Sequence, residues 1–193
     1  MKFSKLFLEK CKNIIDNIDT EEIEKSVELL YNLRERKGRL FVIGSGGGAG
    51  HASHATNDFR KICGIEAYAP YDNISELTAR INDEGWNTTI VNWLKVSNFN
   101  YNDAIFVFSV GGGNNEFFVS MNIVNAIKYS KEIGAKITGI VGRDGGITKE
   151  LGNSIVLIPE DSEYVTPLTE GFQSIVWHLM VSHPKLKKNY TKW

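Results

Sequence analysis

The sequence predicts an α/β protein in which five parallel strands form a three-layer, doubly wound sheet with helices on both faces. Two observations lead to this prediction. Short apolar runs of strand length alternate along the chain with longer segments whose apolar residues recur at steps of three and four. The short runs are apolar at successive positions, which is typical of parallel strands that are buried on both faces.

Two helices are expected before the first strand. The segments FSKLFLEKCKNIIDNI and DTEEIEKSVELLYNLRERKG both place apolar residues at helical spacing. Asp19 followed three residues later by Glu22 is a typical helix start, and Gly38 is a typical helix end. These helices have two possible uses, packing on their own domain or on a partner subunit.

From residue 39 onward, the expected strands and helices alternate. Each strand is a short apolar run, and the helices between them carry the periodic pattern. Strands are expected at 39–44, 65–70, 104–109, 135–142 and 154–159, with helices at 50–62, 73–82, 88–96, 115–133, briefly between the last two strands, and at 167–182. This order suggests a flavodoxin-like layout, in which ligands bind at the carboxyl ends of the strands.

Composition limits the classes of partner. The chain has 193 residues, of which 42% are hydrophobic and 23% charged, as in ordinary globular proteins. A net charge of −1 without a long basic tract argues against nucleic acid and anionic membrane surfaces as partners. No apolar run reaches the roughly 20 residues of a membrane span, and charged residues interrupt the N-terminal segment, so no signal peptide is expected.

The chain is expected to form one domain and to be cytoplasmic. No linker or low-complexity tract interrupts it, so we expect a single domain over residues 1–193, with a helical arm at 1–37 and an α/β core at 38–193. Cys11 and Cys63 have neither metal-binding nor redox-motif spacing, and two reduced thiols are typical of a cytoplasmic protein.

Two glycine-rich turns are the most informative motifs. The first strand leads into GSGGGAG, with five glycines in seven residues, and the third leads into SVGGGNN. Both turns fall at the same edge of a parallel sheet, where backbone N–H groups at a helix start can bind an anion such as phosphate. Ser45, Ser109 and Asn114 add polar side chains. Glycines alone also permit tight turns, but two such turns together favour anion binding.

A dinucleotide-binding fold is the main competing interpretation of the first turn. The residues Gly44, Gly46 and Ala49 match the G-x-G-x-x-G/A fingerprint. That fold needs an acidic residue about 20 positions further on to bind the ribose. That residue belongs at the end of the second strand, where the nearest candidate, Asp72, comes 28 residues after Gly44 and past a proline. The fingerprint also leaves the second glycine turn unexplained, so we favour a phosphate site.

Four titratable residues lie on two of the expected helices. His54 and Asp58 are four residues apart and therefore share one helix face. Glu170 and His178 are eight apart, and their directions on an ideal helix differ by about 80°. Two histidines and two carboxylates suit a divalent transition metal, and they also suit proton transfer between an acid and a base. Spacing alone leaves open that each is an ordinary interior or surface residue.

Taken together, the motifs resemble the sugar isomerase (SIS) domain family, and within it the phosphoheptose isomerases. The resemblance rests on the segments GSGGGAGHASHATNDF, NDEG, FSVGGGNN, GIVGRDGG and TEGFQSIVWH. It implies an aldose–ketose isomerase that converts sedoheptulose 7-phosphate to D-glycero-D-manno-heptose 7-phosphate through an enediol, in heptose synthesis for capsule or lipopolysaccharide. It also implies a homo-oligomer, typically a tetramer with sites shared between subunits.

The resemblance assigns roles to residues of this chain. Asp58 and His178 match catalytic positions, where the carboxylate takes the C2 proton and the imidazole handles the other proton transfers. The matching metal ligands are His54, Asp58, Glu170 and His178, which implies a divalent cation, with zinc as the first choice. The matching substrate-binding positions are Ser45, Gly46, Gly47, Gly48, Asp58, Asn82, Asp83, Ser109, Val110, Gly111, Asn114 and Glu170.

This chain departs from the family pattern in its phosphate loops and in its metal ligands. Family members often have serine at the positions of Gly48, Gly111 and Asn114, glutamate at that of Asp58 and glutamine at that of Glu170. Two other interpretations therefore remain: a catalytically silent SIS module that binds sugar phosphates, or an isomerase of another sugar phosphate.

Three further polar residues lie close to the motifs. Arg143 and Asp144 in GRDGG are expected mainly to form a turn at the end of the fourth strand, although ligand contact is possible there. For His51, a place at the site entrance and a solvated position on the helix are equally open.

Overall fold

A computed structural model describes residues 2–160 and 162–191 of the chain. Five parallel strands form one sheet in the order β2-β1-β3-β4-β5, with β3 at its centre. The strands are β1 (Leu40–Gly44), β2 (Ala67–Tyr68), β3 (Ala104–Ser109), β4 (Lys136–Val141) and β5 (Ser154–Leu157). The expected doubly wound parallel sheet is confirmed, although β2 pairs over only two residues at the sheet edge.

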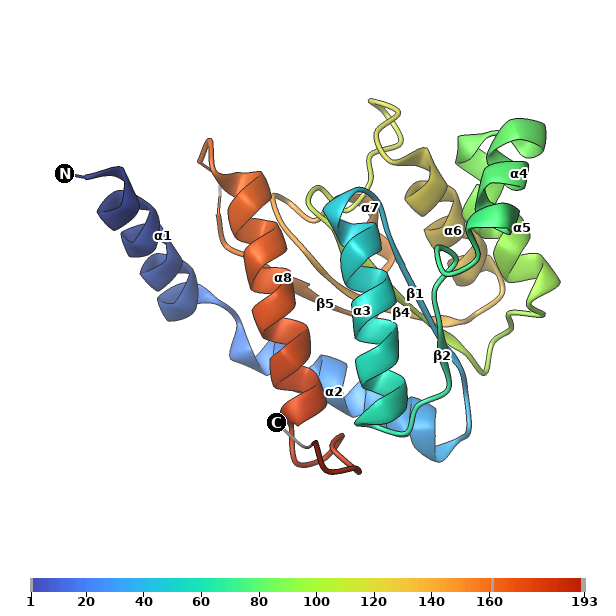
Figure 1. The fold of residues 1–193 in the computed structure, drawn as a ribbon, viewed down its shortest axis with the longest axis horizontal. Coiled ribbons are helices and arrows are strands. Elements are labelled where there is room, and N and C mark those ends of the chain that lie inside the picture. Colours follow the sequence, from blue (N-terminus) through green and yellow to red (C-terminus); the bar gives the residue numbers. More distant parts are fainter. Residues whose placement is uncertain (1, 161, 192–193) are drawn as a thin grey trace.

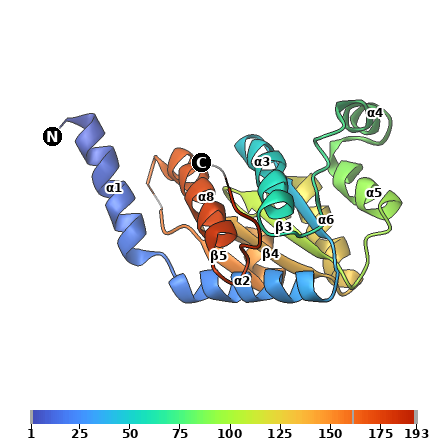
Figure 2. The same cartoon turned by 60° about the horizontal axis from the view of Figure 1, so that its bottom comes forward.

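Helices cover both faces of this sheet (Figure 1). One face carries α2 (Thr20–Glu35), α3 (Gly47–Lys61) and α8 (Val165–Ser182), and α1 (Phe3–Asn17) extends away from that side (Figure 2). The other face carries α5 (Thr89–Val96), α6 (Met121–Glu132) and α7 (Gly146–Leu151). The remaining elements, α4 (Ile74–Glu84) and the short 3₁₀ helix η1 (Trp86–Thr88), pack next to α5 and α6. Across the described residues, no helix combines the length and apolar character needed to cross a membrane.

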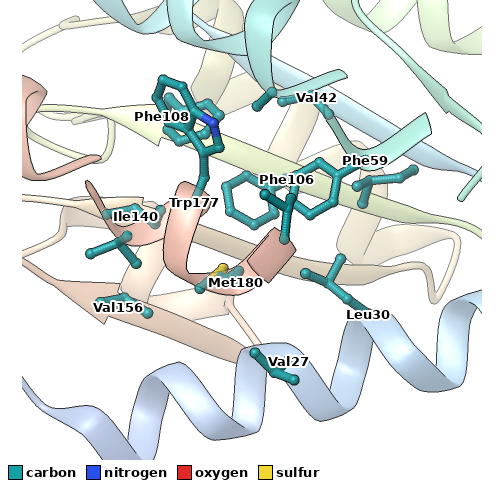
Figure 3. Close-up of a cluster of buried hydrophobic side chains, with 14 of the residues drawn as sticks. Val27, Leu30, Val42, Phe59, Phe106, Phe108, Ile140, Val156, Trp177 and Met180 are labelled. Atoms are coloured by element: carbon teal, nitrogen blue, oxygen red, sulfur yellow. The ribbon is translucent and has the colours of Figure 1, made fainter. Parts of the chain in front are cut away.

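Alternate strand residues build two hydrophobic cores. Phe106 and Phe108 of β3 point to the face of α2, α3 and α8, whereas Val107 between them points to the face of α5 and α6. Figure 3 shows Trp177 of α8 in the first core, next to Phe108. Its ring is 1% exposed and lies edge-on to Phe108, with centroids 5.4 Å apart. The core therefore fixes the position of α8 against the end of β3.

The two N-terminal helices differ in how they pack. Helix α2 begins where expected, because the Asp19 carboxylate accepts a hydrogen bond from the Glu22 amide, and its buried face joins the first core. Helix α1 buries only Ile14, and its first turns contact the domain mainly where Phe3 and Phe7 meet the ring of Tyr164. Much of the apolar surface of α1 is thus exposed in a single chain.

The helix expected at 115–133 is wrong at its start, because α6 begins only at Met121. Residues 114–120 instead form a turn that is closed by a bridge between Asn114 and Val119. The Asn114 side chain accepts a hydrogen bond from the Phe117 amide, and Phe118 and Ser120 have φ values near +54°. These local bonds and left-handed residues compete with a helix. Only the first glycine turn leads directly into a helix.

Candidate functional site

The two glycine turns meet at the carboxyl ends of β1 and β3, as predicted. Between them lies a cavity of about 660 Å³, which we call the anion cleft. It is lined by Ser45, Gly46, Ser109, Val110, Gly111, Gly113, Asn114, Phe117, Val119, Ser120, Arg143, Asp144 and Thr166. Doubly wound folds bind their ligands at this place, beyond the carboxyl ends of the strands.

The first turn presents free backbone amides at the start of α3. Gly46 has a φ of +59°, which turns the chain sharply from β1 into the helix. The amides of Gly48 and Ala49 bond to the carbonyls of Ser45 and Gly46 at 3.0 Å, whereas those of Gly46 and Gly47 donate to no other described residue. Two free amides at the positive end of a helix suit an anion.

Gly48, which was expected to contact substrate, faces the sheet. It is buried, and a Cβ there would lie 2.5 Å from the backbone oxygen of Phe108. The glycine therefore allows α3 to cross closely over the end of β3, and any side chain at this position would require α3 and β3 to move apart. Ser45 supplies a hydroxyl group in this turn, and its Oγ accepts a hydrogen bond from the buried Asn122 side chain at 3.0 Å.

The second turn is held mainly by its own hydrogen bonds. The Ser109 hydroxyl, which is almost buried, accepts a bond from the Gly112 amide at 3.0 Å. The Gly112 carbonyl accepts a bond from the Thr148 hydroxyl at 2.6 Å, which fastens the turn to α7. Gly112 and Gly113 both have positive φ values. This turn thus forms a rigid wall of the anion cleft with fewer free amides than the first.

Three of the four predicted metal ligands converge between α3 and α8. One ligand atom from each of His54, Asp58 and His178 lies within 4.8 Å of the others. Oδ2 of Asp58 is 3.5 Å from Nε2 of His54 and 3.6 Å from Nε2 of His178. Ligand atoms bound tetrahedrally to zinc at about 2.0–2.2 Å are separated by roughly 3.3–3.6 Å, so these two distances fit such a site.

Hydrogen bonds orient two of these ligands. Nδ1 of His178 lies 2.7 Å from the Ser174 carbonyl and donates to it, which leaves the Nε2 lone pair directed at Asp58. Asp58 is 3% exposed, and its carboxylate accepts bonds from Nδ2 of the Asn57 side chain at 3.1 Å and from Trp177 Nε1 at 3.3 Å. A buried carboxylate with two imidazoles is a donor set that suits a divalent cation of the zinc type.

Glu170 does not join these three residues. It lies two turns earlier on α8, and its carboxylate is so close to Gly47 that a Cβ there would be 2.5 Å from Oε2. Beside it, His51 packs against Phe108 and Trp177. Burial lowers the pKa of His51, although a hydrogen bond to the Glu170 backbone opposes this shift. His51 is thus a partly buried residue on α3, between the anion cleft and the metal-ligand cluster.

The metal-ligand cluster and the anion cleft are distinct within one chain. The cluster borders a cavity of about 300 Å³ that is also lined by Lys61 and Lys187. The anion cleft lies at the start of α3 and the metal-ligand cluster lies further along the same helix. From Gly47 to His54 the rise along α3 is about 10 Å. Asn82 and Asp83 are in neither cavity, because they lie on α4, which has no buried residue and packs chiefly on α5 and η1.

The fold and the site together define an α/β protein with an anion cleft at the switch point of a doubly wound sheet. Residues 6–142 match the sequence family described as SIS domain, and the chain belongs to this family. The phosphoheptose isomerase of Helicobacter pylori strain P12 is 27% identical over 89% of this chain and 86% of its own length. The lincomycin biosynthesis protein LmbN of Streptomyces lincolnensis is 31% identical over 81% of this chain and 59% of its own length.

Solved structures share the fold over nearly the whole chain. The phosphoheptose isomerase GmhA of Neisseria gonorrhoeae superimposes with a TM-score of 0.78 at 23% identity, covering 93% of this chain and 94% of that one. A phosphoheptose isomerase of Francisella tularensis has a TM-score of 0.80 at 17% identity, covering 96% of both chains. The predicted SIS fold is therefore confirmed.

Proposed function

We propose that this protein is an aldose–ketose isomerase that converts sedoheptulose 7-phosphate to D-glycero-D-manno-heptose 7-phosphate. The observation that carries the proposal is the cluster of His54, Asp58 and His178, because binding of a phosphate alone needs no such group. The Helicobacter relatives named phosphoheptose isomerase support the choice of substrate. We further propose that the reaction serves heptose synthesis for capsule or lipopolysaccharide in the cytoplasm.

The geometry suggests how the substrate is held. Its phosphate binds in the anion cleft, at the free amides of Gly46 and Gly47, with Ser45, Ser109, Val110, Gly111 and Asn114 around it. The sugar chain then extends from the anion cleft toward an Asp58 carboxylate, which another copy of the chain can supply if the sites are shared between subunits as proposed below. Binding energy from the phosphate, which does not react, positions the carbons that do.

The reaction moves one carbon-bound proton and one hydroxyl proton. From ketose to aldose, a proton leaves C1 and another arrives at C2, while a hydroxyl proton passes from O1 to O2. Asp58 exchanges the carbon-bound proton, which is the C2 proton in the reverse direction. His178 handles the hydroxyl protons through Nε2, the nitrogen that faces Asp58. The same lone pair cannot bind a metal at that moment, so the two roles of His178 alternate or exclude each other.

A divalent cation, with zinc as our first choice, fits His54, Asp58 and His178. Bound there, it supplies Lewis-acid stabilisation of negative charge on the substrate oxygens. Glu170 was expected as a fourth ligand and lies beside Gly47 in this structure. We propose that Glu170 acts near the substrate, where its negative charge beside Gly47 opposes phosphate binding and has to be offset by a positive group.

We propose a homo-tetramer in which sites are shared between subunits and the 193 residues form one domain with a helical arm at 1–37. Asn82 and Asp83 are consistent with this assembly, because they line neither cavity of their own chain and the substrate contact that the resemblance implies for them would then be made in another copy. Ile74 and Trp86 on and beside α4 are 64% and 41% exposed. Apolar surface of this kind is typical of subunit contacts.

The test is turnover of sedoheptulose 7-phosphate followed by NMR, with and without a chelator. Asp58→Asn and His178→Ala are compared with His183→Ala, which removes a histidine that pairs with Glu24 away from the cluster. We expect turnover in the parent and in His183→Ala only. Binding of the sugar phosphate without turnover in the parent would contradict the enzyme and favour the silent SIS module.

A further inference from the structure

The anion cleft contains one positive side chain among its described lining residues, that of Arg143. Two negatively charged side chains also lie at this cleft. Asp144 lines the same cleft, and the Glu170 carboxylate lies against Gly47, next to the free amides. A phosphate monoester carries a charge of about −1.5 to −2 at neutral pH. Backbone amides supply only partial charges, so a phosphate in this cleft needs a full positive charge to offset the two carboxylates.

Arg143 is positioned by the backbone around it. It follows β4 and adopts a φ of +53°, a left-handed conformation that is unusual for a residue with a side chain. The flanking Gly142 amide donates to the Val110 carbonyl at 2.9 Å, and the Gly145 amide donates to the Gly142 carbonyl at 3.0 Å. These bonds enforce the unfavourable conformation, and backbone strain of this kind persists only where the surroundings impose it.

The side chain of Arg143 crosses the second glycine turn. Its Cδ atom lies 3.6 Å from the point where a Cβ on Gly111 would be, which is ordinary van der Waals contact and places the arginine stem directly beside Gly111. No carboxylate among the described residues lies within 4.0 Å of the guanidinium group. The group is exposed and therefore available to a ligand.

Asp144 has a different task in the same turn. Its Oδ1 accepts a hydrogen bond from the Gly146 amide at 3.1 Å, which closes the turn before α7. Asp144 therefore has the turn role that the sequence predicts. The Arg143 guanidinium forms no hydrogen bond within this turn among the described residues.

We propose that Arg143 is a phosphate-binding residue, whose guanidinium group binds the ligand's terminal phosphate opposite the amides of Gly46 and Gly47. Guanidinium groups bind phosphate through two parallel hydrogen bonds, which fixes orientation as well as charge. Arg143 then takes over from the hydroxyl groups that Gly111 and Asn114 do not provide. The identification of the ligand as a sugar phosphate rests on the proposed function, whereas phosphate binding itself does not.

The test measures binding rather than turnover. Inorganic phosphate and sedoheptulose 7-phosphate are titrated separately into the full chain, and the dissociation constants are measured by calorimetry. We expect Arg143→Gln to weaken both by about tenfold or more, Arg143→Lys to weaken them less, and Asp144→Asn to tighten them. Lys149→Gln is the matched control, because it removes a positive charge from α7 that lines a different cavity.

Arg143→Gly keeps the test decisive if the glutamine variant folds poorly. Glycine accepts the positive φ without strain, so this variant removes the guanidinium while it relieves the backbone. Equal binding by the parent and Arg143→Gly would overturn the proposal, as would a parent that binds neither ligand. Phosphate binding that depends on Arg143 in a protein without turnover would sustain the proposal and refute the isomerase.

Discussion

Trp177 donates a hydrogen bond from Nε1 to Oδ2 of Asp58 across 3.3 Å, and the same oxygen faces Nε2 of His54 and of His178. One oxygen thus joins the hydrophobic core to the metal-ligand cluster. Because Trp177 is 1% exposed and packs on Phe108, the core holds the carboxylate in place. Support of this kind from outside the ligand set commonly tunes metal sites.

Trp177→Phe tests this link by removing the indole N–H while an aromatic ring remains. We expect the free energy of unfolding to fall by about 1–3 kcal/mol, since a buried carboxylate loses a donor and the core loses volume. Metal affinity should fall by about tenfold or more. Urea unfolding and metal titration give the two values. Trp93→Phe is the control, because Trp93 packs on Phe41 in the opposite core. Equal loss of metal affinity in both variants would contradict the link.

Measurement of the metal content tests whether Glu170 is a fourth ligand beside His54, Asp58 and His178. We expect the purified parent to hold a divalent metal, and His54→Ala, Asp58→Asn and His178→Ala to lose it. Glu170→Gln should retain it, because the Glu170 carboxylate lies beside Gly47 and outside the cluster. Elemental analysis after dialysis measures the content. Loss of metal from Glu170→Gln would instead establish the four-ligand set that the family resemblance implies.

Local pattern was enough to predict most of the fold. Continuous apolar runs identified the strands because both faces of a parallel sheet are buried, and the spacing of His54 and Asp58 placed them correctly on one helix face. The start of α6 was missed because the side chain of Asn114 and the left-handed backbone of Phe118 and Ser120 replace the first helical turns. Propensity does not reveal such local competition.

The spacing of residues along the sequence did not reveal which side chains from distant segments lie together in the structure. Glu170 and His178 share a helix, yet the packing of α8 on α3 places one beside Gly47 and the other beside Asp58. Arg143 reaches the anion cleft only because β4 ends next to the second glycine turn, over Gly111. Contacts of this kind depend on the tertiary structure, so the sequence could suggest the ligand class but not the complete set of binding residues.

Two glycines of α3 should respond oppositely to alanine. A Cβ on Gly48 would lie 2.5 Å from the Phe108 carbonyl oxygen, whereas a Cβ on Gly50 meets nothing within 4 Å. We expect Gly48→Ala to destabilise the protein by about 1–3 kcal/mol through overpacking. Gly50→Ala should stabilise it by about 0.5–1 kcal/mol through helix propensity. Thermal and urea unfolding measure both. A stable Gly48→Ala variant would mean that α3 can move away from β3.

Glu22 gives the protein a stability that depends on pH. Burial alone would raise the pKa of Glu22, but bonds from Lys25, Ser154 and the Ile155 amide outweigh it and hold the pKa below 4.5. Because the folded pKa is lower than the unfolded one, this stabilisation is complete above about pH 4.5 and is lost as the pH falls through the folded value.

Glu22→Gln should therefore be less stable than the parent at pH 7, and the difference should shrink as the pH falls below 4.5. Urea unfolding at several pH values between 7 and 3 measures the difference in free energy. Glu21→Gln is the control, since it removes a similar charge from the first turn of α2. That control accounts for the helix dipole, because both residues lie near the same positive helix end. A difference for Glu22→Gln that stays constant with pH would show that packing of the side chain, rather than its charge, stabilises the contact between α2 and β5.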